Sequence, residues 1–198
     1  IAAQYPVILG CEYFDEGSAI NTVSVDNIRA GYKAAEHLIK LGHKRIGYIS
    51  GPEGIVLSRD RLKGFQKAMS DYGLQPDELL IEVGSFSYDS GWTAMDRFLA
   101  LEVGPTAVFA ASDEMAIGAI KAARKAGLDV PKDLAVVGMD NIKFASIFEP
   151  SITTIAQPMC EIGCTAMELL LKVINKEVIP QKKVVLKDEL IVRESCGG

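Results

Sequence analysis

The chain has 198 residues, 48% of them hydrophobic and 24% charged, which is enough to bury a core and too apolar for disorder. Acidic residues outnumber basic ones by 26 to 21, and no lysine- or arginine-rich run offers a nucleic acid a basic patch. No stretch approaches the ~18 consecutive apolar residues that a membrane helix needs, and the first residues lack a signal-peptide pattern. We therefore expect a cytoplasmic globular protein that is, taken alone, a poor DNA binder.

The first half of the chain predicts helices that alternate with short strands. One helix is expected from an N-cap at Asp26 to a terminator at Gly42, and a second from Ser58 to Gly73. Residues 45–50 and 81–84 are typical of short strands. The apolar stripes expected to pack the two helices are Ile28, Tyr32, Ala35 and Ile39, then Leu62, Phe65, Met69 and Tyr72.

The same alternation continues through the middle of the chain. A third helical stripe consists of Tyr88, Trp92, Met95 and Leu99, and a fourth helix is predicted from Asp113 to Gly127. Residues 106–111 and 134–139 have no polar face, which is typical of strands buried on both sides. Such alternation predicts βαβ units, and therefore an α/β fold with a parallel sheet covered on both faces.

After Pro150 the pattern changes. Residues 153–158 look like an extended connector, and a long helix is predicted over 159–175. Two short β runs, 184–186 and 190–192, end the chain. The apolar stripe of the long helix comprises Met159, Ile162, Ala166, Leu169, Leu170 and Val173.

Polar and aromatic side chains follow the predicted strands at their carboxyl ends, where open parallel sheets bind ligands. An arginine donates to neighbouring hydroxyls, carboxylates accept from them, and an aromatic ring covers the C–H face of a sugar. The sequence therefore predicts a site for a polyhydroxylated ligand. Its candidate residues at this stage are Arg61, Phe86, Ser112, Asp113 and Asp140.

Each of these residues also fits a purely structural role. Asp113 could cap its helix, and Asp140 could form a turn with its own backbone. Arg61 also fits a solvated helix position, and Phe86 a place in the core. The ligand hypothesis depends on the set as a whole.

The sequence contains few of the motifs that catalysis or metal binding would require. The chain has no phosphate-binding glycine loop, no nucleophile elbow and no dinucleotide-binding fingerprint, and neither histidine stands beside a plausible nucleophile. Cys160 and Cys164 are four residues apart on a predicted helix, but they fit two small half-buried thiols better than a metal site. No enzyme activity, no cofactor and no metal site are expected.

Several segments together resemble the lac-repressor/galactose-repressor family of transcription factors. The most specific are PTAVFAASDEMAIGAI (105–120) and GLDVPKDLAVVGMDN (127–141), in this order. VDNIRAGYKAAEHLIKLGHKRIGYISGP (25–52), SRDRLKGFQKAM (58–69), PSITTIAQP (150–158) and LIVRES (190–195) extend the resemblance over nearly the whole chain.

The resemblance implies a type I periplasmic-binding-protein-like core, made of two α/β subdomains joined by three crossovers, with an effector in the cleft. Arg61 would hydrogen-bond the effector, Asp140 would accept from its hydroxyls, and Phe86 would stack on it. Ser112 or Asp113 would add polar contacts, and Gln157 would line the crossover. Gly10-Cys11 stands where sugar-responsive members often carry an aspartate after the strand, which leaves the identity of the sugar open.

The resemblance also implies boundaries, partners and a function. The C-terminal subdomain would be complete in residues 26–155 and 187–198, and the N-terminal subdomain partial, in 1–25 and 156–186. The expected function is sensing of a sugar or sugar derivative for a repressor, whose operator DNA would bind through an absent N-terminal helix-turn-helix. The alternative is a periplasmic sugar-binding protein of a transporter, which shares the fold.

The resemblance further implies a homodimer, joined through the helix from Glu114 and through Ile147-Phe148, although these two apolar residues fit a place in their own core equally well. No membrane is expected to bind. Some family members also bind a phosphoprotein, for which an exposed arginine cluster would be expected. The helix from residue 159 carries Glu161 and Glu168 outward instead, so that partner is not predicted.

Overall fold

A computed structural model describes residues 5–15, 20–179 and 182–198. The chain divides into two compact units, which we call unit 1 (1–26 and 157–188) and unit 2 (27–156 and 189–198). That these units are the two expected subdomains stays a prediction. None of the helices in the described part of the chain has the length and apolarity to cross a membrane.

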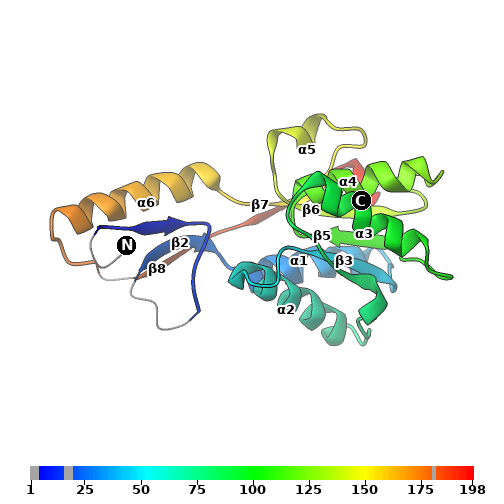
Figure 1. The fold of residues 1–198 in the computed structure, drawn as a ribbon, viewed down its shortest axis with the longest axis horizontal. Coiled ribbons are helices and arrows are strands. Elements are labelled where there is room, and N and C mark those ends of the chain that lie inside the picture. Colours follow the sequence, from blue (N-terminus) through cyan, green and yellow to red (C-terminus); the bar gives the residue numbers. More distant parts are fainter. Residues whose placement is uncertain (1–4, 16–19, 180–181) are drawn as a thin grey trace. The chain divides into compact units, whose positions relative to one another are not determined.

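Unit 2 is built on a six-stranded sheet, in the order β4-β3-β5-β6-β7-β9 (Figure 1). All neighbouring strands are parallel except β7 and β9, which confirms the predicted parallel α/β sheet. The strands are β3 (Ile46–Ser50), β4 (Ile81–Val83), β5 (Ala107–Ala110), β6 (Ala135–Asp140), β7 (Thr153–Ala156) and β9 (Glu189–Ile191).

The expectation that residues 153–158 form a connector is thus wrong, because β7 is an inner strand of this sheet. Its two threonines, Thr153 and Thr154, are both fully buried. The Thr153 hydroxyl donates to the Arg193 carbonyl at 3.1 Å, and the Thr154 hydroxyl accepts from the Asn141 amide at 3.3 Å. Buried polar groups that find partners in this way cost little.

Two helix pairs cover the sheet, α1 (Asn27–Lys40) with α2 (Val56–Asp71), and α3 (Tyr88–Leu99) with α4 (Asp113–Lys125). Neighbouring residues of β3 show that the pairs lie on opposite faces. Tyr48 stacks on Phe65 of α2, with ring centroids 5.0 Å apart, whereas a Cβ on Gly47 would press against Phe98 of α3. Side chains alternate between the faces of a strand, so the sheet is covered on both sides (Figure 1).

Glycines set how closely each pair packs. A Cβ on Gly31 would overlap the Arg61 carbonyl, and a Cβ on Gly64 would overlap the Ile28 carbonyl, so the backbones of α1 and α2 touch. Gly91 of α3 and Gly118 of α4 meet backbone in the same way. The contact faces therefore consist of small residues.

This packing corrects the predicted stripes. Ile28 and Tyr72 lie exposed, and Tyr88 lies at the surface of α3. The predicted Phe65, Met69 and Met95 are buried. Apolar periodicity missed the true faces because glycine and alanine carry little hydrophobic signal. The buried faces include Ala30, Gly31, Ala34, Ala35 and Leu38 in α1, and Gly91, Ala94, Met95 and Phe98 in α3.

The predicted C-terminal ends of the helices agree better with the structure than the predicted apolar stripes do. Gly42, Gly73 and Gly127 all have positive φ and follow the last residues of α1, α2 and α4. After Gly127, for example, the Leu128 amide donates to the Ala123 carbonyl at 3.1 Å and closes the helix. The start of the second helix was wrong, since α2 begins at Val56 rather than Ser58.

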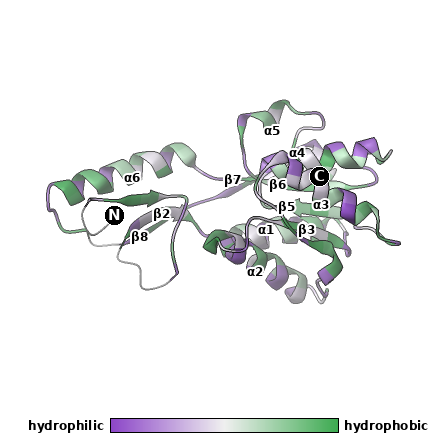
Figure 2. Cartoon of the chain, viewed as in Figure 1, coloured by the Kyte–Doolittle hydropathy of each residue, from purple (hydrophilic) through white to green (hydrophobic). Residues whose placement is uncertain are grey.

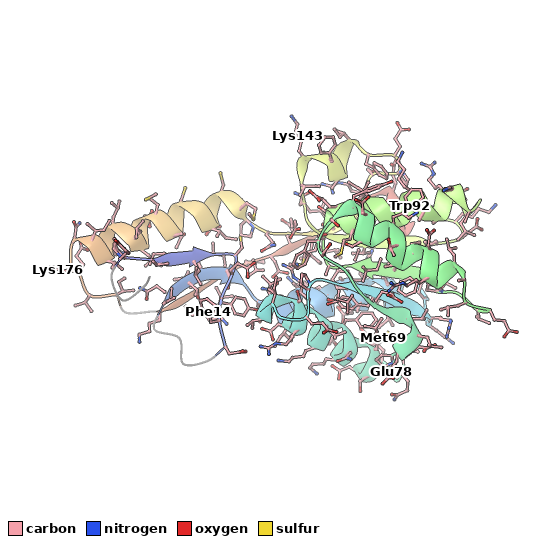
Figure 3. All side chains as sticks on the ribbon, viewed as in Figure 1. Phe14, Met69, Glu78, Trp92, Lys143 and Lys176 are labelled. Carbon is pink, nitrogen blue, oxygen red and sulfur yellow. The ribbon has the colours of Figure 1, made fainter. Side chains whose placement is uncertain are left out.

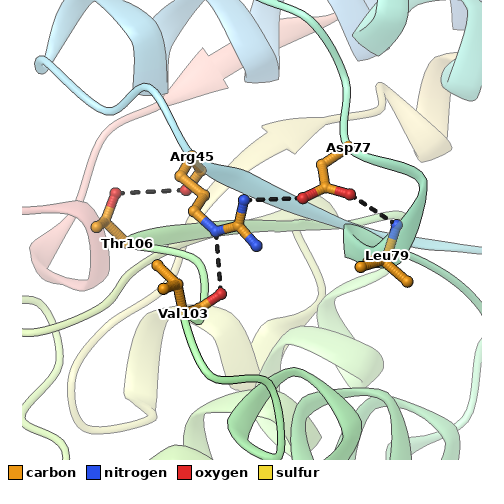
Figure 4. A network of polar contacts seen from close by, with 5 residues as sticks. All are labelled: Arg45, Asp77, Leu79, Val103 and Thr106. Atoms are coloured by element: carbon orange, nitrogen blue, oxygen red, sulfur yellow. Dashed lines mark hydrogen bonds and ion pairs between the residues drawn. The ribbon is translucent and has the colours of Figure 1, made fainter.

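A polar network ties together the loops at the amino ends of the strands (Figure 4). Arg45 donates from Nε to the Val103 carbonyl at 3.0 Å and from Nη1 to Asp77 Oδ2 at 2.8 Å. Asp77 Oδ1 in turn accepts from the Leu79 amide at 3.0 Å, at the start of the short 3₁₀ helix η1 (Glu78–Leu80). Arg45 thus ties the segments before β4 and β5 to the start of β3.

Unit 1 contains a three-stranded parallel sheet, in the order β1 (Ile8–Gly10), β2 (Asn21–Val25) and β8 (Lys183–Leu186). The helix α6 (Met159–Ile174) packs on β1 and β2. Of its predicted stripe, Ile162 and Leu169 are buried and Met159 is exposed. The remaining three stripe residues are half-buried.

Most of α6 is apolar (Figure 2), and the face opposite the buried stripe is exposed. It carries Cys160, Cys164, Met167, Leu171 and Ile174, spaced as one stripe of a helix. We call these five residues the outer stripe. The expectation that Cys160 and Cys164 are half-buried is wrong, because both are exposed here.

Candidate functional site

Arg61 lies on α2, and its side chain turns inward to the carboxyl end of the sheet of unit 2. It is only 4% exposed, so a solvated position for this residue is wrong. Its Nε donates to Asn27 Oδ1 at 2.8 Å, and its Nη1 donates to the Ala111 carbonyl, just after β5, at 2.7 Å. These two bonds fix the plane of the guanidinium group.

Phe86 lies beside this arginine, between β4 and α3. Its ring centroid is 6.0 Å from Arg61 Cζ, and the residue is half-buried rather than in the core. A Cβ on Gly51 would collide with the ring, so glycine at that position leaves the space that Phe86 occupies. Phe86 has φ +62°, a conformation that non-glycine residues keep only where the surroundings determine it.

Ser112 joins the same cluster from the start of α4. Its Oγ accepts from the Met115 amide at 3.2 Å and lies 3.4 Å from the Phe86 carbonyl, to which it donates. Ser112 is therefore the N-cap of α4, and the suggestion that Asp113 caps this helix is wrong. Arg61, Phe86 and Ser112 thus meet at the carboxyl ends of β3, β4 and β5.

Asp113 is the first residue of α4 and is fully buried. Its Oδ2 accepts from the Ile142 amide at 2.9 Å, while Oδ1 has no hydrogen-bond partner among the residues that the structure describes. Burial raises the pKa of Asp113 to about 7, and the neighbouring Asp140 adds to the rise. Hydrogen bonds from Thr154 and Ile142 lower the pKa but only partly offset the burial.

Asp140 ends β6 and begins a left-handed turn. Asp140 has φ +108° and Asn141 has φ +59°. Asn141 Oδ1 accepts from Arg193 Nη2 at 2.7 Å, and Arg193 Nη1 donates to the Ile152 carbonyl at 2.6 Å. Gln157 follows Ala156, the β7 residue paired with Asp140, but it belongs to unit 1.

Sequence reasoning assigned no site role to three residues that shape this region. Asn27 and Arg193 hold Arg61 and Asn141 through hydrogen bonds. Ser58 is buried, and its hydroxyl has no hydrogen-bond partner in the described part of the chain. Asn27 follows the predicted N-cap Asp26, and Ser58 begins the second predicted helix. Polar side chains at these two helix starts could therefore have indicated a role in the site. Arg193 lies 52 positions from its partner Asn141, and no local pattern could reveal that contact.

Comparison with known proteins shows to which family the chain belongs. The model of the periplasmic binding protein-like domain matches residues 35–196. A regulatory protein of the LacI family from Chloroflexus aggregans is 32% identical with a TM-score of 0.88, over 99% of this chain and 70% of that chain. The chain belongs to the lac-repressor/galactose-repressor family of transcriptional regulators. This confirms the resemblance seen in the sequence.

Two further relatives of the family illustrate the match. The transcriptional repressor CytR of Escherichia coli K12 is 40% identical over 190 residues, which cover 96% of this chain and 55% of CytR. A solved complex of the regulator CelR with cellobiose is 37% identical, with a TM-score of 0.88, over 98% of this chain and 59% of that chain. The chain thus spans about half the length of the curated relatives it matches.

Proposed function

We propose that this chain is the effector-sensing core of a DNA-binding transcriptional repressor, and that its effector is a sugar or sugar derivative. The observation that carries the proposal is the convergence of Arg61, Phe86 and Ser112 at the carboxyl rim of the sheet. Membership of a family of transcriptional regulators supports the regulatory role. A binding protein of a transporter is less well supported, since the relatives named above are regulators.

The chemistry of the rim suits a polyol. Two edges of the Arg61 guanidinium are engaged within the protein, which orients its remaining N–H groups without further ordering. The Phe86 ring offers a flat apolar face to the C–H side of a sugar ring. Asp140 would accept from the hydroxyls, with Ser112 and Gln157 as the further candidates. The proposed set needs no catalytic group and no cofactor.

Calorimetry with a panel of sugars and sugar phosphates, cellobiose among them, tests the site. Arg61→Ala should weaken binding of any sugar that the wild type binds by roughly 2–4 kcal/mol, because buried hydroxyls lose their donor. Lys63→Ala, on the exposed face of the same helix, is the matched control and should change nothing.

Arg61 also holds α1, so the Arg61→Ala variant must first match the wild type in its circular dichroism. Phe86→Leu leaves those bonds in place and should also weaken the same sugar. Unchanged affinity in both variants would remove the site assignment.

The remaining parts of the proposal concern the whole protein. Operator DNA would bind through a helix-turn-helix outside this chain, since the sequence is acidic overall and has no lysine- or arginine-rich run. Such a repressor works in the cytoplasm.

A homodimer is also proposed, joined through the helix from Glu114 and through Ile147-Phe148, at the end of the short helix α5 (Lys143–Ile147). Phe144 is 64% exposed and Ile147 62% exposed, and the Lys143 side chain extends outward from the unit (Figure 3). A hollow of about 830 Å³ beside them is lined in part by Phe148 and Pro131. Exposed apolar side chains grouped in this way are typical of interfaces.

Light scattering tests the dimer. Phe148→Glu should yield monomers, because the new charge would lie in the contact. The control is Leu79→Glu, an equally drastic change at an exposed leucine of η1. A dimer that survives Phe148→Glu would remove this contact.

A further inference from the structure

The turn after β6 carries Asp140, the acceptor of the proposed site, in an unusual conformation. Two successive non-glycine residues, Asp140 and Asn141, have positive φ. Such residues persist only where neighbouring groups determine them. The groups that determine this turn are therefore expected to control where the Asp140 carboxylate lies.

One such group approaches from the β5 side of β6. Asp113 follows β5, is fully buried, and accepts from the Ile142 amide directly after the turn. A Cβ on Gly138 of β6 would collide with Asp113 Oδ1, so the carboxylate lies close against the β6 backbone. With no exposed surface and one oxygen bonded to the turn, Asp113 is built into the protein rather than turned to a ligand.

The second group approaches from the β7 and β9 side. Arg193, just after β9, donates from Nη2 to Asn141 Oδ1 and from Nη1 to the Ile152 carbonyl just before β7. Its own amide donates to Thr153 Oγ1 at 2.8 Å, which fixes the arginine backbone to β7. The Asn141 amide donates to Thr154 of the same strand. The turn is thus held from both neighbours of β6 in the sheet.

We propose that Asp113 and Arg193 are positioning residues that hold the Asp140–Asn141 turn in its left-handed form. They act on the effector through Asp140 and do not contact it. This inference rests on the proposed function for its last step only. We call the hydrogen bonds that Asp113 and Arg193 make to this turn the clamp, and the clamp can be tested without an effector.

The first test needs no effector. Amide exchange of Ile142, followed by NMR, should become about tenfold faster or more in Asp113→Ala, because the amide loses its acceptor. In Asp113→Asn the side-chain oxygen still accepts, so Ile142 should stay protected. The Ala111 amide, which donates to the Ile49 carbonyl in the sheet, is the internal control. Unchanged exchange of Ile142 in Asp113→Ala overturns the clamp.

A second measurement serves if Asp113→Ala does not fold. In the wild type, the chemical shift of the Ile142 amide, followed against pH, should show a titration midpoint near pH 7, where Asp113 gains or loses its proton. In Asp113→Asn this chemical shift should not change with pH. Asp140, at the end of β6, is the charged neighbour that raises the pKa of Asp113, while Arg193 acts on the turn from the β9 side. Arg193→Met should perturb the Asn141 resonances from that side. An Ile142 shift that titrates equally in wild type and Asp113→Asn contradicts the assignment.

The last step is tested with the panel sugar that the wild type binds most tightly. Asp113→Asn should stay within about threefold of wild-type affinity, whereas Asp113→Ala and Arg193→Met should lose about tenfold. Equal losses in Asp113→Asn and Asp113→Ala, with Ile142 still protected, would show that the Asp113 charge contacts the sugar and would overturn the positioning role. If no panel sugar binds, the proposed function fails, and the exchange and titration results still decide on the clamp.

Discussion

Two helices of similar length, α4 in unit 2 and α6 in unit 1, differ sharply in how much of their surface they bury. Eight of the 13 residues of α4 are buried, against two of the 16 residues of α6. The sequence of α6 is nevertheless the more apolar of the two (Figure 2). Apolar composition therefore did not decide burial. What decided it was the number of surfaces that each helix meets.

α4 meets two surfaces, a helix and a sheet. It packs against α3 through Gly118 and against β5 and β6 of the sheet. Its buried residues are mostly alanine and glycine, which let these surfaces approach closely. α6 packs mainly against β1 and β2 of the sheet in the described part of its own unit. Its outer stripe therefore remains in solvent.

The comparison is tested most strongly by truncating a core side chain of unit 2 and an exposed side chain of α6 in unit 1. Phe109, fully buried in β5, packs against Tyr48 with ring centroids 5.3 Å apart. Phe109→Ala should lower the free energy of unfolding by about 3–5 kcal/mol, because it leaves a cavity. Leu171→Ala on the outer stripe should cost less than about 1 kcal/mol, since this side chain is 52% exposed. Unfolding followed by circular dichroism measures both, and similar losses would contradict the contrast.

The glycine contacts give the next largest effect. Gly64→Ala should destabilise by about 1–3 kcal/mol, because the new methyl group meets the α1 backbone and the helices must move apart. Gly163 of α6 has nothing within 4 Å of its Cβ position in the described residues. Gly163→Ala should therefore stabilise by about 0.5–1 kcal/mol through helix propensity. Denaturant titrations measure the free energy of unfolding of both variants. Changes of opposite sign in Gly64→Ala and Gly163→Ala would support the comparison, whereas destabilisation in both would mean that α6 is also closely covered.

Asp113 makes unit 2 sensitive to pH. Its pKa is about 7 in the folded protein and 3.8 in the unfolded reference, so between these values the folded state binds more protons. The free energy of unfolding should fall as pH rises through this window, by at most about 1.4 kcal/mol per pH unit, relative to Asp113→Asn. Subtracting the Asp113→Asn curve cancels the titration of the other groups. A flat difference between pH 4 and 7 would contradict the raised pKa.

The smallest effect is expected on the outer stripe. Met167 is 56% exposed, so Met167→Lys should change stability by less than about 0.5 kcal/mol. Thermal unfolding and light scattering at the same concentration measure the effect. A larger loss of stability, or a change in molecular mass, would mean that a partner covers this face in solution.

The sequence by itself determined most of the element types and the family. Buried strands without a polar face, helices ending before glycine, and the ordered segments 105–120 and 127–141 predicted a parallel α/β sheet, which the structure confirms. These features are local in the chain, and backbone sterics and side-chain periodicity express them within a few residues. The placement of Arg61, Phe86 and Ser112 at one rim also followed, because parallel strands bring their carboxyl ends together.

Tertiary structure alone decided which helix faces are buried and which polar residues serve the fold. Gly31 and Gly64 carry no hydrophobic signal, yet they set the contact between α1 and α2. Asp113 and Arg193 are 80 positions apart in the chain but hold the same turn. Contacts between residues this distant form only when the strands assemble, because their energies depend on packing distance and burial rather than on sequence neighbours.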